Sequence, residues 1–158
     1  MKGTIIKVLL VLSMLVFIGS NISLPSDESS ADNTTGTVTI SIKGPPDLGN
    51  ILETGEVEIK EGEKVLDVLL RITRREEILI EYRGSGAGAY VEGIEDLYEF
   101  DRGPESGWMY KINGVFPNRS AGAWPVEPGD HVEWVYTEDL GQDIRAALDG
   151  EQRNGEDH

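Results

Sequence analysis

The chain has 158 residues, 39% of them hydrophobic, which is enough for one domain with one modest core. Its formal net charge of -15, from 14 Lys and Arg against 29 Asp and Glu, argues against nucleic-acid binding, which depends on concentrated positive charge. The absence of cysteine excludes disulfides, a thiol nucleophile, zinc–thiolate sites and a lipoprotein anchor.

Residues 1–23 have the composition of an export signal. Lys2 and Lys7 form a basic start, and Val8 to Ile18 is an apolar run of 11 residues. A membrane-spanning helix needs about 20 apolar residues, so we expect a signal peptide or an uncleaved signal anchor. The sequence therefore predicts an extracytoplasmic protein. The protein is secreted if this segment is cleaved. If the segment is retained, it anchors the protein and is its only membrane contact.

Three further regions follow the signal segment. Residues 24–36 (LPSDESSADNTTG) are rich in Ser, Asp, Asn and Thr, which is typical of a flexible polar spacer. We expect the folded domain over residues 37–141 and a polar C-terminal tail over residues 142–158.

The first half of the domain combines short strands with one helix. Apolar and polar residues alternate over Thr37–Lys43 and again over Glu56–Lys60, which predicts two half-buried strands. Apolar residues at helical spacing predict a helix over Lys64–Glu76. Alternation over Ile78–Tyr82 predicts a third strand.

The second half of the domain holds most of the aromatic residues. Trp108 to Ile112 alternates as a strand, and Asn113-Gly114 supplies the positive-φ pair of a two-residue hairpin turn. The return strand, Val115 to Phe116, is short because Pro117 cannot donate to a ladder. Pro128-Gly129-Asp130 fits a type II turn, and a final strand is expected over His131–Thr137.

This order of elements predicts an α+β domain in which an antiparallel or mixed sheet packs on one helix. A β-grasp-like fold fits it best.

Four aromatic residues are the candidate ligand contacts: Trp108, Tyr110, Phe116 and Trp124. The strand alternation of Trp108 and Tyr110 favours the core over a binding surface. Phe116 and Trp124 lie beside prolines in a turn-rich stretch, where a large aromatic is more often exposed. For these two, a binding surface and a core role remain equally open.

Two other clusters have weaker functional interpretations. The run from Gly84 to Ala89 resembles a phosphate loop only superficially, because no helix start and no Lys-Ser/Thr pair follow it. We interpret it as a flexible connector, with gating of a ligand as an alternative. Five acidic residues could offer oxygen ligands to calcium: Glu92, Glu95, Asp96, Glu99 and Asp101. Their spacing fits no known calcium loop, and a solvated acidic face is the better interpretation. Glu95 and Asp96 with Glu99 could also form paired glycosidase carboxylates, but any acidic chain offers such pairs by chance.

Nucleophilic catalysis is poorly supplied. His131 opens a strand after a turn and His158 ends a polar tail, and neither Ser106 nor Ser120 lies in the strand-to-helix setting of a nucleophile elbow. We therefore expect a protein that is not an enzyme, requires no cofactor and has no metal site.

The segment from Gly103 to Gly141 closely resembles a bacterial domain family related to the C-terminal domain of transcobalamin and intrinsic factor. The matching elements include Ser106-Gly107-Trp108-Met109-Tyr110, Asn113-Gly114, Pro128-Gly129-Asp130 and Glu133-Trp134-Val135-Tyr136-Thr137. With weaker matches upstream, the resemblance extends over roughly residues 38–141. It implies a β-grasp-like domain of an exported protein.

The resemblance also implies a ligand. In the animal transport proteins the related domain covers one face of cobalamin and a separate helical barrel covers the other, and this chain has no room for that barrel. The leading hypothesis is thus an exported, non-catalytic binding module for a cobalamin-like corrinoid or another small molecule. The alternative is a cell-surface module that binds a protein or polymer without a small ligand.

Overall fold

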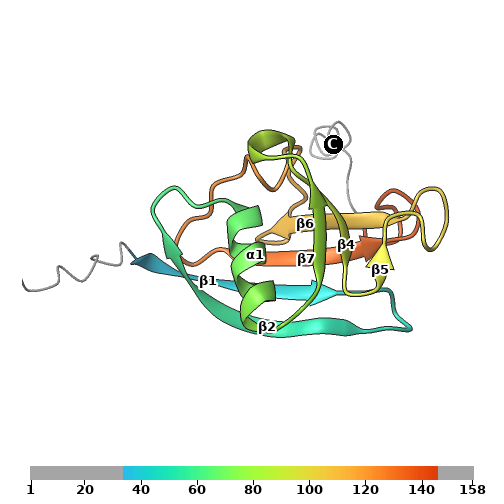
Figure 1. Ribbon diagram of the computed structural model, residues 1–158, viewed down its shortest axis with the longest axis horizontal. Helices are drawn as coiled ribbons and strands as arrows, with labels where there is room; N and C mark the ends of the chain where they lie inside the picture. Colours follow the sequence, from blue (N-terminus) through green and yellow to red (C-terminus); the bar gives the residue numbers. More distant parts are fainter. Residues whose placement is uncertain (1–33, 146–158) are drawn as a thin grey trace, which may run out of the picture. The chain divides into compact units, whose positions relative to one another are not determined.

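The computed structural model describes residues 34–145 (Figure 1). The predicted signal segment, residues 24–33 of the predicted spacer and residues 146–158 of the predicted tail lie outside this range. The described elements are β1 (Thr34–Lys43), β2 (Asn50–Lys60), α1 (Val65–Arg75), β3 (Ile80–Arg83), the 3-10 turn η1 (Gly86–Gly88), β4 (Tyr90–Ile94), β5 (Leu97–Tyr98), β6 (Gly107–Ile112) and β7 (His131–Thr137). None of the described helices is long and apolar enough to cross a membrane.

The larger sheet has four strands in the order β2-β1-β7-β6. Strands β1 and β7 are parallel, with Ile40 opposite Val132, and the two outer pairs are antiparallel. Of the two predicted alternatives, an antiparallel or a mixed sheet, the structure has the mixed sheet. Because β1 and β7 come from the two ends of the domain, their pairing closes the fold and leaves β2 and β6 as the edges.

Helix α1 lies on one face of this sheet (Figure 1). Its apolar residues recur every three or four positions, so Val65, Leu69 and Ile72 are all fully buried. The Asp67 carboxylate accepts a 2.8 Å hydrogen bond from the Lys64 N–H at the start of the helix. Burial of each such side chain contributes about 1.5–3 kcal/mol, which is the main stabilisation of a helix this short.

A second sheet, β3-β4-β5, lies on the same side as α1 (Figure 1). Strand β4 packs closely because Gly93 has no side chain: an added Cβ would lie 2.5 Å from the Tyr98 ring. The inner faces of both sheets and the apolar face of α1 form one hydrophobic core. Within residues 34–145 the fold is thus α+β with one α-helix, as the sequence predicts, but it has two sheets where we expected one.

Several element boundaries differ from the sequence predictions. Strand β1 begins at Thr34, inside the predicted spacer, and β2 begins at Asn50. Strand β3 begins at Ile80 because the Ile78 N–H instead bonds the Thr73 carbonyl and closes the end of the helix. The predicted return strand after Asn113-Gly114 is reduced to a single bridge between Ile112 and Val115.

Candidate functional site

Trp108 and Tyr110 are core residues, 6% and 7% exposed. The Trp108 indole N–H donates a 2.9 Å hydrogen bond to the Leu97 carbonyl, and its ring meets Tyr136 edge to face at 5.3 Å between centroids. The Tyr110 ring lies 5.5 Å from that of Trp134, and burial raises the pKa of the Tyr110 hydroxyl to about 12. The alternation that favoured the core for these two residues is confirmed.

The hairpin turn predicted at Asn113-Gly114 is present. Both residues have positive φ, 51° and 84°, and the main chains of Ile112 and Val115 exchange hydrogen bonds of 2.9 and 3.0 Å. The turn is held in place by the Asn113 side chain, which donates to Asp130 and accepts from the His131 N–H, each at 2.8 Å. The Asn113 contacts therefore hold the two ends of the segment 115–130 together. This segment carries Phe116 and Trp124.

Trp124 is anchored at the start of helix α1. The Val65 N–H donates to the Trp124 carbonyl at 3.0 Å, and the Leu66 N–H donates to the Ala121 carbonyl at 3.1 Å. The first N–H groups of a helix have no partner within it, so this segment satisfies two of them. Trp124 itself is half-buried and packs against the hydrophobic core. The residue is therefore more deeply seated than its turn-rich sequence indicates.

A pocket of about 300 Å³ opens beside Trp124. It is lined by Ile112, Asn113, Arg119, Trp124, Pro125, Glu127 and Asp130. No described residue accepts a hydrogen bond from the Trp124 indole N–H or pairs with the Arg119 guanidinium. The pocket therefore combines an aromatic face and two available donors with the carboxylates of Glu127 and Asp130.

Phe116 is not among the residues that line this pocket. Its ring sits under the Lys111 ammonium, 5.1 Å from ring centroid to Nζ. Lys111 and Lys43 both pair with the Glu133 carboxylate. These three charged residues lie on the face of the larger sheet opposite the core, because Lys111 and Glu133 alternate with the buried residues of β6 and β7. The structure therefore does not bring the two predicted ligand contacts into one cavity.

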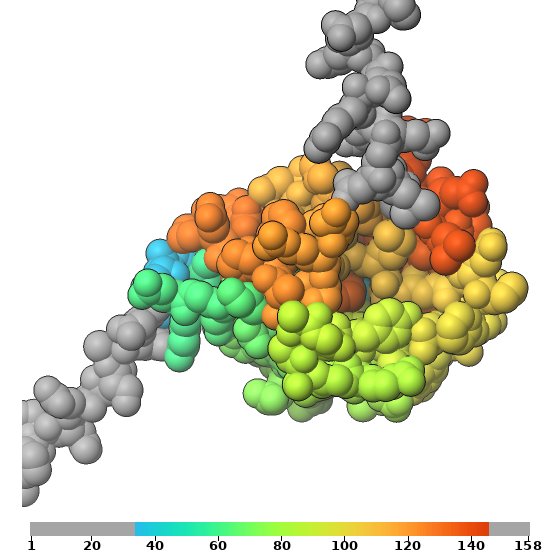
Figure 2. Space-filling model, turned by 90° about the horizontal axis from the view of Figure 1, so that it is seen from above, coloured from blue at the N-terminus to red at the C-terminus, as the bar shows by residue number. Residues whose placement is uncertain are grey.

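The glycine-rich run, interpreted as a flexible connector, packs against the Trp124 segment. Figure 2 shows the segment around residue 85 beside the segment around residue 120. The Ser120 hydroxyl donates a 2.6 Å hydrogen bond to the Ala87 carbonyl, and a Cβ added to Gly122 would lie 2.0 Å from the Gly86 carbonyl oxygen. The glycines thus permit a backbone-to-backbone contact that supports the pocket.

The acidic residues considered for calcium make structural contacts. Arg83 pairs with Glu92 and Glu99, the Glu95 carboxylate accepts the Leu79 N–H, and Asp101 accepts the Tyr98 N–H. Within residues 34–145, no group of three or more acidic or histidine side chains is arranged to hold a metal ion.

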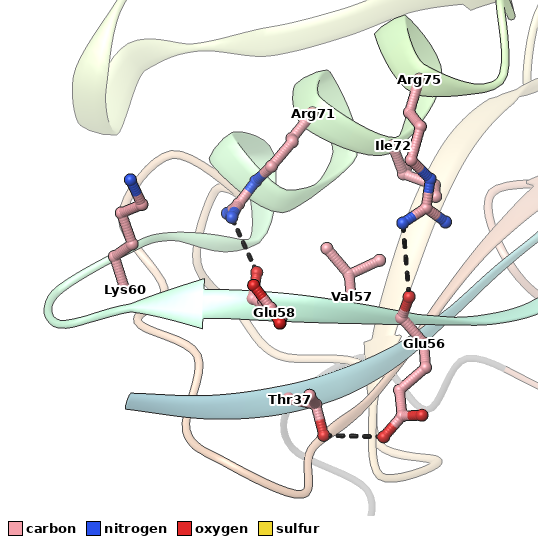
Figure 3. Close-up of a pocket in the computed structure, with 8 residues that line it drawn as sticks. All are labelled: Thr37, Glu56, Val57, Glu58, Lys60, Arg71, Ile72 and Arg75. Carbon is pink, nitrogen blue, oxygen red and sulfur yellow. Dashed lines mark hydrogen bonds between the residues drawn. The ribbon is translucent and has the colours of Figure 1, made fainter. Parts of the chain in front are cut away.

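A cavity of about 530 Å³ lies between β2 and α1 (Figure 3). Its lining residues are Thr37, Glu56, Val57, Glu58, Lys60, Arg71, Ile72 and Arg75. Arg71 donates a 2.7 Å hydrogen bond to the Glu58 carbonyl, and Arg75 donates to the Glu56 carbonyl at 3.5 Å (Figure 3). This groove was not predicted, although Arg71 and Arg75 are four residues apart on the predicted helix and therefore share one face of it.

Residues 62–138 match the family described as "Domain of unknown function (DUF4430)". This segment is a DUF4430 domain. The DUF4430 segment contains α1, the second sheet, β6 and β7. It also contains the glycine-rich run and the Trp124 segment against which that run packs. Strands β1 and β2 precede it.

Several solved structures resemble the chain, among them these two. One is haptocorrin in complex with Cbi, with 19% identity, a TM-score of 0.50, and coverage of 68% of this chain and 27% of haptocorrin. The other is a protein of Ruminococcus gnavus ATCC 29149, described as a candidate metal-binding protein, with 19% identity, a TM-score of 0.45, and coverage of 65% of this chain and 97% of that chain. A search of the curated proteins found no match.

The chain spans about a quarter of the haptocorrin chain, and at this identity the likeness shows the fold alone. Together with the DUF4430 match, this fold is consistent with the predicted relation to the transcobalamin C-terminal domain.

Proposed function

We propose that this chain is an exported, non-catalytic binding module that holds a small molecule at the Trp124 pocket. The observation that carries the proposal is the half-buried indole of Trp124, whose N–H has no partner among the described residues and whose backbone is bonded to the start of α1 at 3.0 Å. A rigidly anchored aromatic with an available donor is what a small-molecule site requires, because most affinity comes from apolar contact and a few placed polar groups give specificity.

The ligand class proposed is a corrinoid of the cobalamin type. A corrinoid is a large flat ring with amide side chains, so it offers an apolar face to the indole and amide oxygens to the Trp124 and Arg119 donors. A pocket of about 300 Å³ cannot enclose such a ring. This chain would cover one face or edge, and a second protein would cover the rest.

Two structural proposals accompany this function. The mixed four-stranded sheet packed on one helix supports a β-grasp-like arrangement. The basic and apolar N-terminal segment, residues 1–23, supports delivery outside the cytoplasm by a signal peptide or signal anchor.

Calorimetric titration of cobalamin and cobinamide into the full chain tests the function. We expect saturable heat, with affinity at least tenfold weaker in Trp124→Ala and unchanged in Tyr82→Ala, which truncates an aromatic that is 45% exposed on the second sheet. Absence of heat with the unmodified chain, or equal affinity in Trp124→Ala, would refute the proposal. Thermal melts of both variants confirm that each remains folded.

A further inference from the structure

Strand β2 is an edge of the larger sheet, and its outward main-chain groups can be assigned from the register. Glu58 lies opposite Thr37, and Glu56 lies opposite Thr39. The Thr37 carbonyl accepts the Gly129 N–H at 2.8 Å and the Thr39 N–H donates to Asp130 at 2.9 Å, so both threonines direct their main chain away from β2. In an antiparallel pair, the residues opposite them must also point outward. Glu56 and Glu58 therefore present their N–H and C=O groups on the free edge.

Two arginines of α1 occupy this edge. Arg71 and Arg75, four residues apart, donate to the carbonyls of Glu58 and Glu56, two residues apart (Figure 3). Four helical residues rise about 6 Å and two strand residues about 6.8 Å, so the two spacings match. A guanidinium has donors but no acceptor. The outward N–H groups of Glu56 and Glu58 therefore have no side-chain acceptor among the described residues.

The groove between β2 and α1 has the size and the neighbours that a strand would need. Its volume of about 530 Å³ lies within the range of ligand sites, and Val57 and Ile72 lie at its base (Figure 3). Addition of an extended peptide to an exposed sheet edge is a known recognition mode in which main-chain hydrogen bonds supply the affinity.

We propose that β2 binds an extended peptide with acidic side chains at alternating positions, which adds as a fifth strand between β2 and α1. The peptide's main-chain N–H groups replace Arg71 and Arg75 on the carbonyls of Glu58 and Glu56, and its carbonyls accept the outward N–H groups. The Arg71 and Arg75 guanidinium groups, which also pair with Glu63 and Glu76, then take the peptide's carboxylates as additional partners. Acidic residues at i and i+2 of a strand lie on one face about 6.8 Å apart, which matches the arginine spacing.

The competing explanation is that the arginines only shield the edge. Proteins often cover exposed edge strands with charged side chains to prevent aggregation. Under that explanation the groove has no occupant, and a peptide that offers main-chain donors binds no better than one that lacks them.

The probe is an acetylated and amidated heptapeptide that alternates Glu and Val, with Glu at both ends, titrated into the isotopically labelled full chain. Its control is the same peptide N-methylated at alternate residues, which removes the donors and leaves the composition intact. We expect amide shifts centred on Glu56 and Glu58 and affinity at least tenfold tighter than for the control. Equal binding of the two peptides, or no binding, would overturn the proposal and leave edge shielding as the explanation.

Three variants sharpen the test. Glu58→Pro removes an outward N–H without removing a bond to β1, so we expect at least a tenfold loss of peptide affinity. Arg71→Gln/Arg75→Gln removes the carboxylate partners and should also weaken binding, whereas Arg83→Gln, on the second sheet, should not. Peptide affinity unchanged by both β2-groove variants would contradict the assignment.

Discussion

The Tyr110 hydroxyl donates a 2.6 Å hydrogen bond to the Arg119 carbonyl and so ties strand β6 to the segment that carries Trp124. The bond joins a core residue to the wall of the proposed binding pocket, because Arg119 is one of the lining residues. Pocket geometry and core packing are therefore coupled through one side chain.

Tyr110→Phe should destabilise the protein by about 1–3 kcal/mol, because it leaves a partly buried carbonyl without its donor. Urea unfolding followed by tryptophan fluorescence measures the change. The matched control is Tyr82→Phe, whose hydroxyl has no hydrogen-bond partner among the described residues and which should leave the unfolding free energy unchanged. A Tyr110→Phe midpoint equal to that of the unmodified protein would show that the Arg119 contact contributes nothing.

Trp134→Ala and Trp124→Ala should differ in their effect on stability. Trp134 is 2% exposed, so its truncation should cost about 3–5 kcal/mol and unfold much of the population. Trp124 is half-buried, and its truncation should cost about 1 kcal/mol. Thermal melts of both variants decide the matter. Comparable losses would make Trp124 a structural residue and remove the main support for the proposed site.

Gly122→Ala should be costly, because the new methyl group would lie 2.0 Å from the Gly86 carbonyl oxygen and would force the two segments apart. Overpacking of this kind typically costs about 1–3 kcal/mol. Gly88→Ala, in the neighbouring segment, is the control because no heavy atom lies within 4 Å of its added Cβ. Differential scanning calorimetry compares the two, and equal transition temperatures would contradict the close contact.

Glu133 should make the protein's stability depend on acid pH. Burial alone would raise the pKa of its carboxyl, but hydrogen bonds from Lys111 and Lys43 outweigh burial and lower that pKa. A carboxyl with a lowered folded-state pKa stabilises the protein above its unfolded-state pKa, about 4.3 for Glu, and loses this contribution as pH falls through the folded-state value. Unfolding free energies from pH 7 to 3 should fall less steeply in Glu133→Gln. Parallel profiles would show that the ion pairs are not coupled to folding.

Local patterns were enough to predict most single elements. The strand His131–Thr137, the turn at Asn113-Gly114 and the helix follow from alternation, positive-φ residues and helical spacing, all of which act over a few residues. A strand near β3 was predicted, but the second sheet to which it belongs was not, because β5 has only two residues, too few for a periodic signal.

Long-range contacts explain the rest of the differences. The proline-rich sequence around Trp124 gave no sign that its carbonyl would accept the Val65 N–H at the start of α1, a contact between residues far apart in the chain. The glycine-rich run likewise has no local reason to pack on Gly122. The groove at β2 exists because β2 is an edge strand of the larger sheet. The order of strands in a sheet is set by long-range pairing, so local sequence patterns do not predict it.

The indole N–H signals of the three tryptophans give the most direct test of binding at Trp124. Trp108 donates to Leu97 and the Trp134 N–H is buried, so both should exchange slowly with solvent, while that of Trp124 should exchange fast. When cobalamin is titrated into the ¹⁵N-labelled full chain, we expect the Trp124 indole signal to shift and the other two to stay in place. An unmoved Trp124 signal at saturating cobalamin would contradict it.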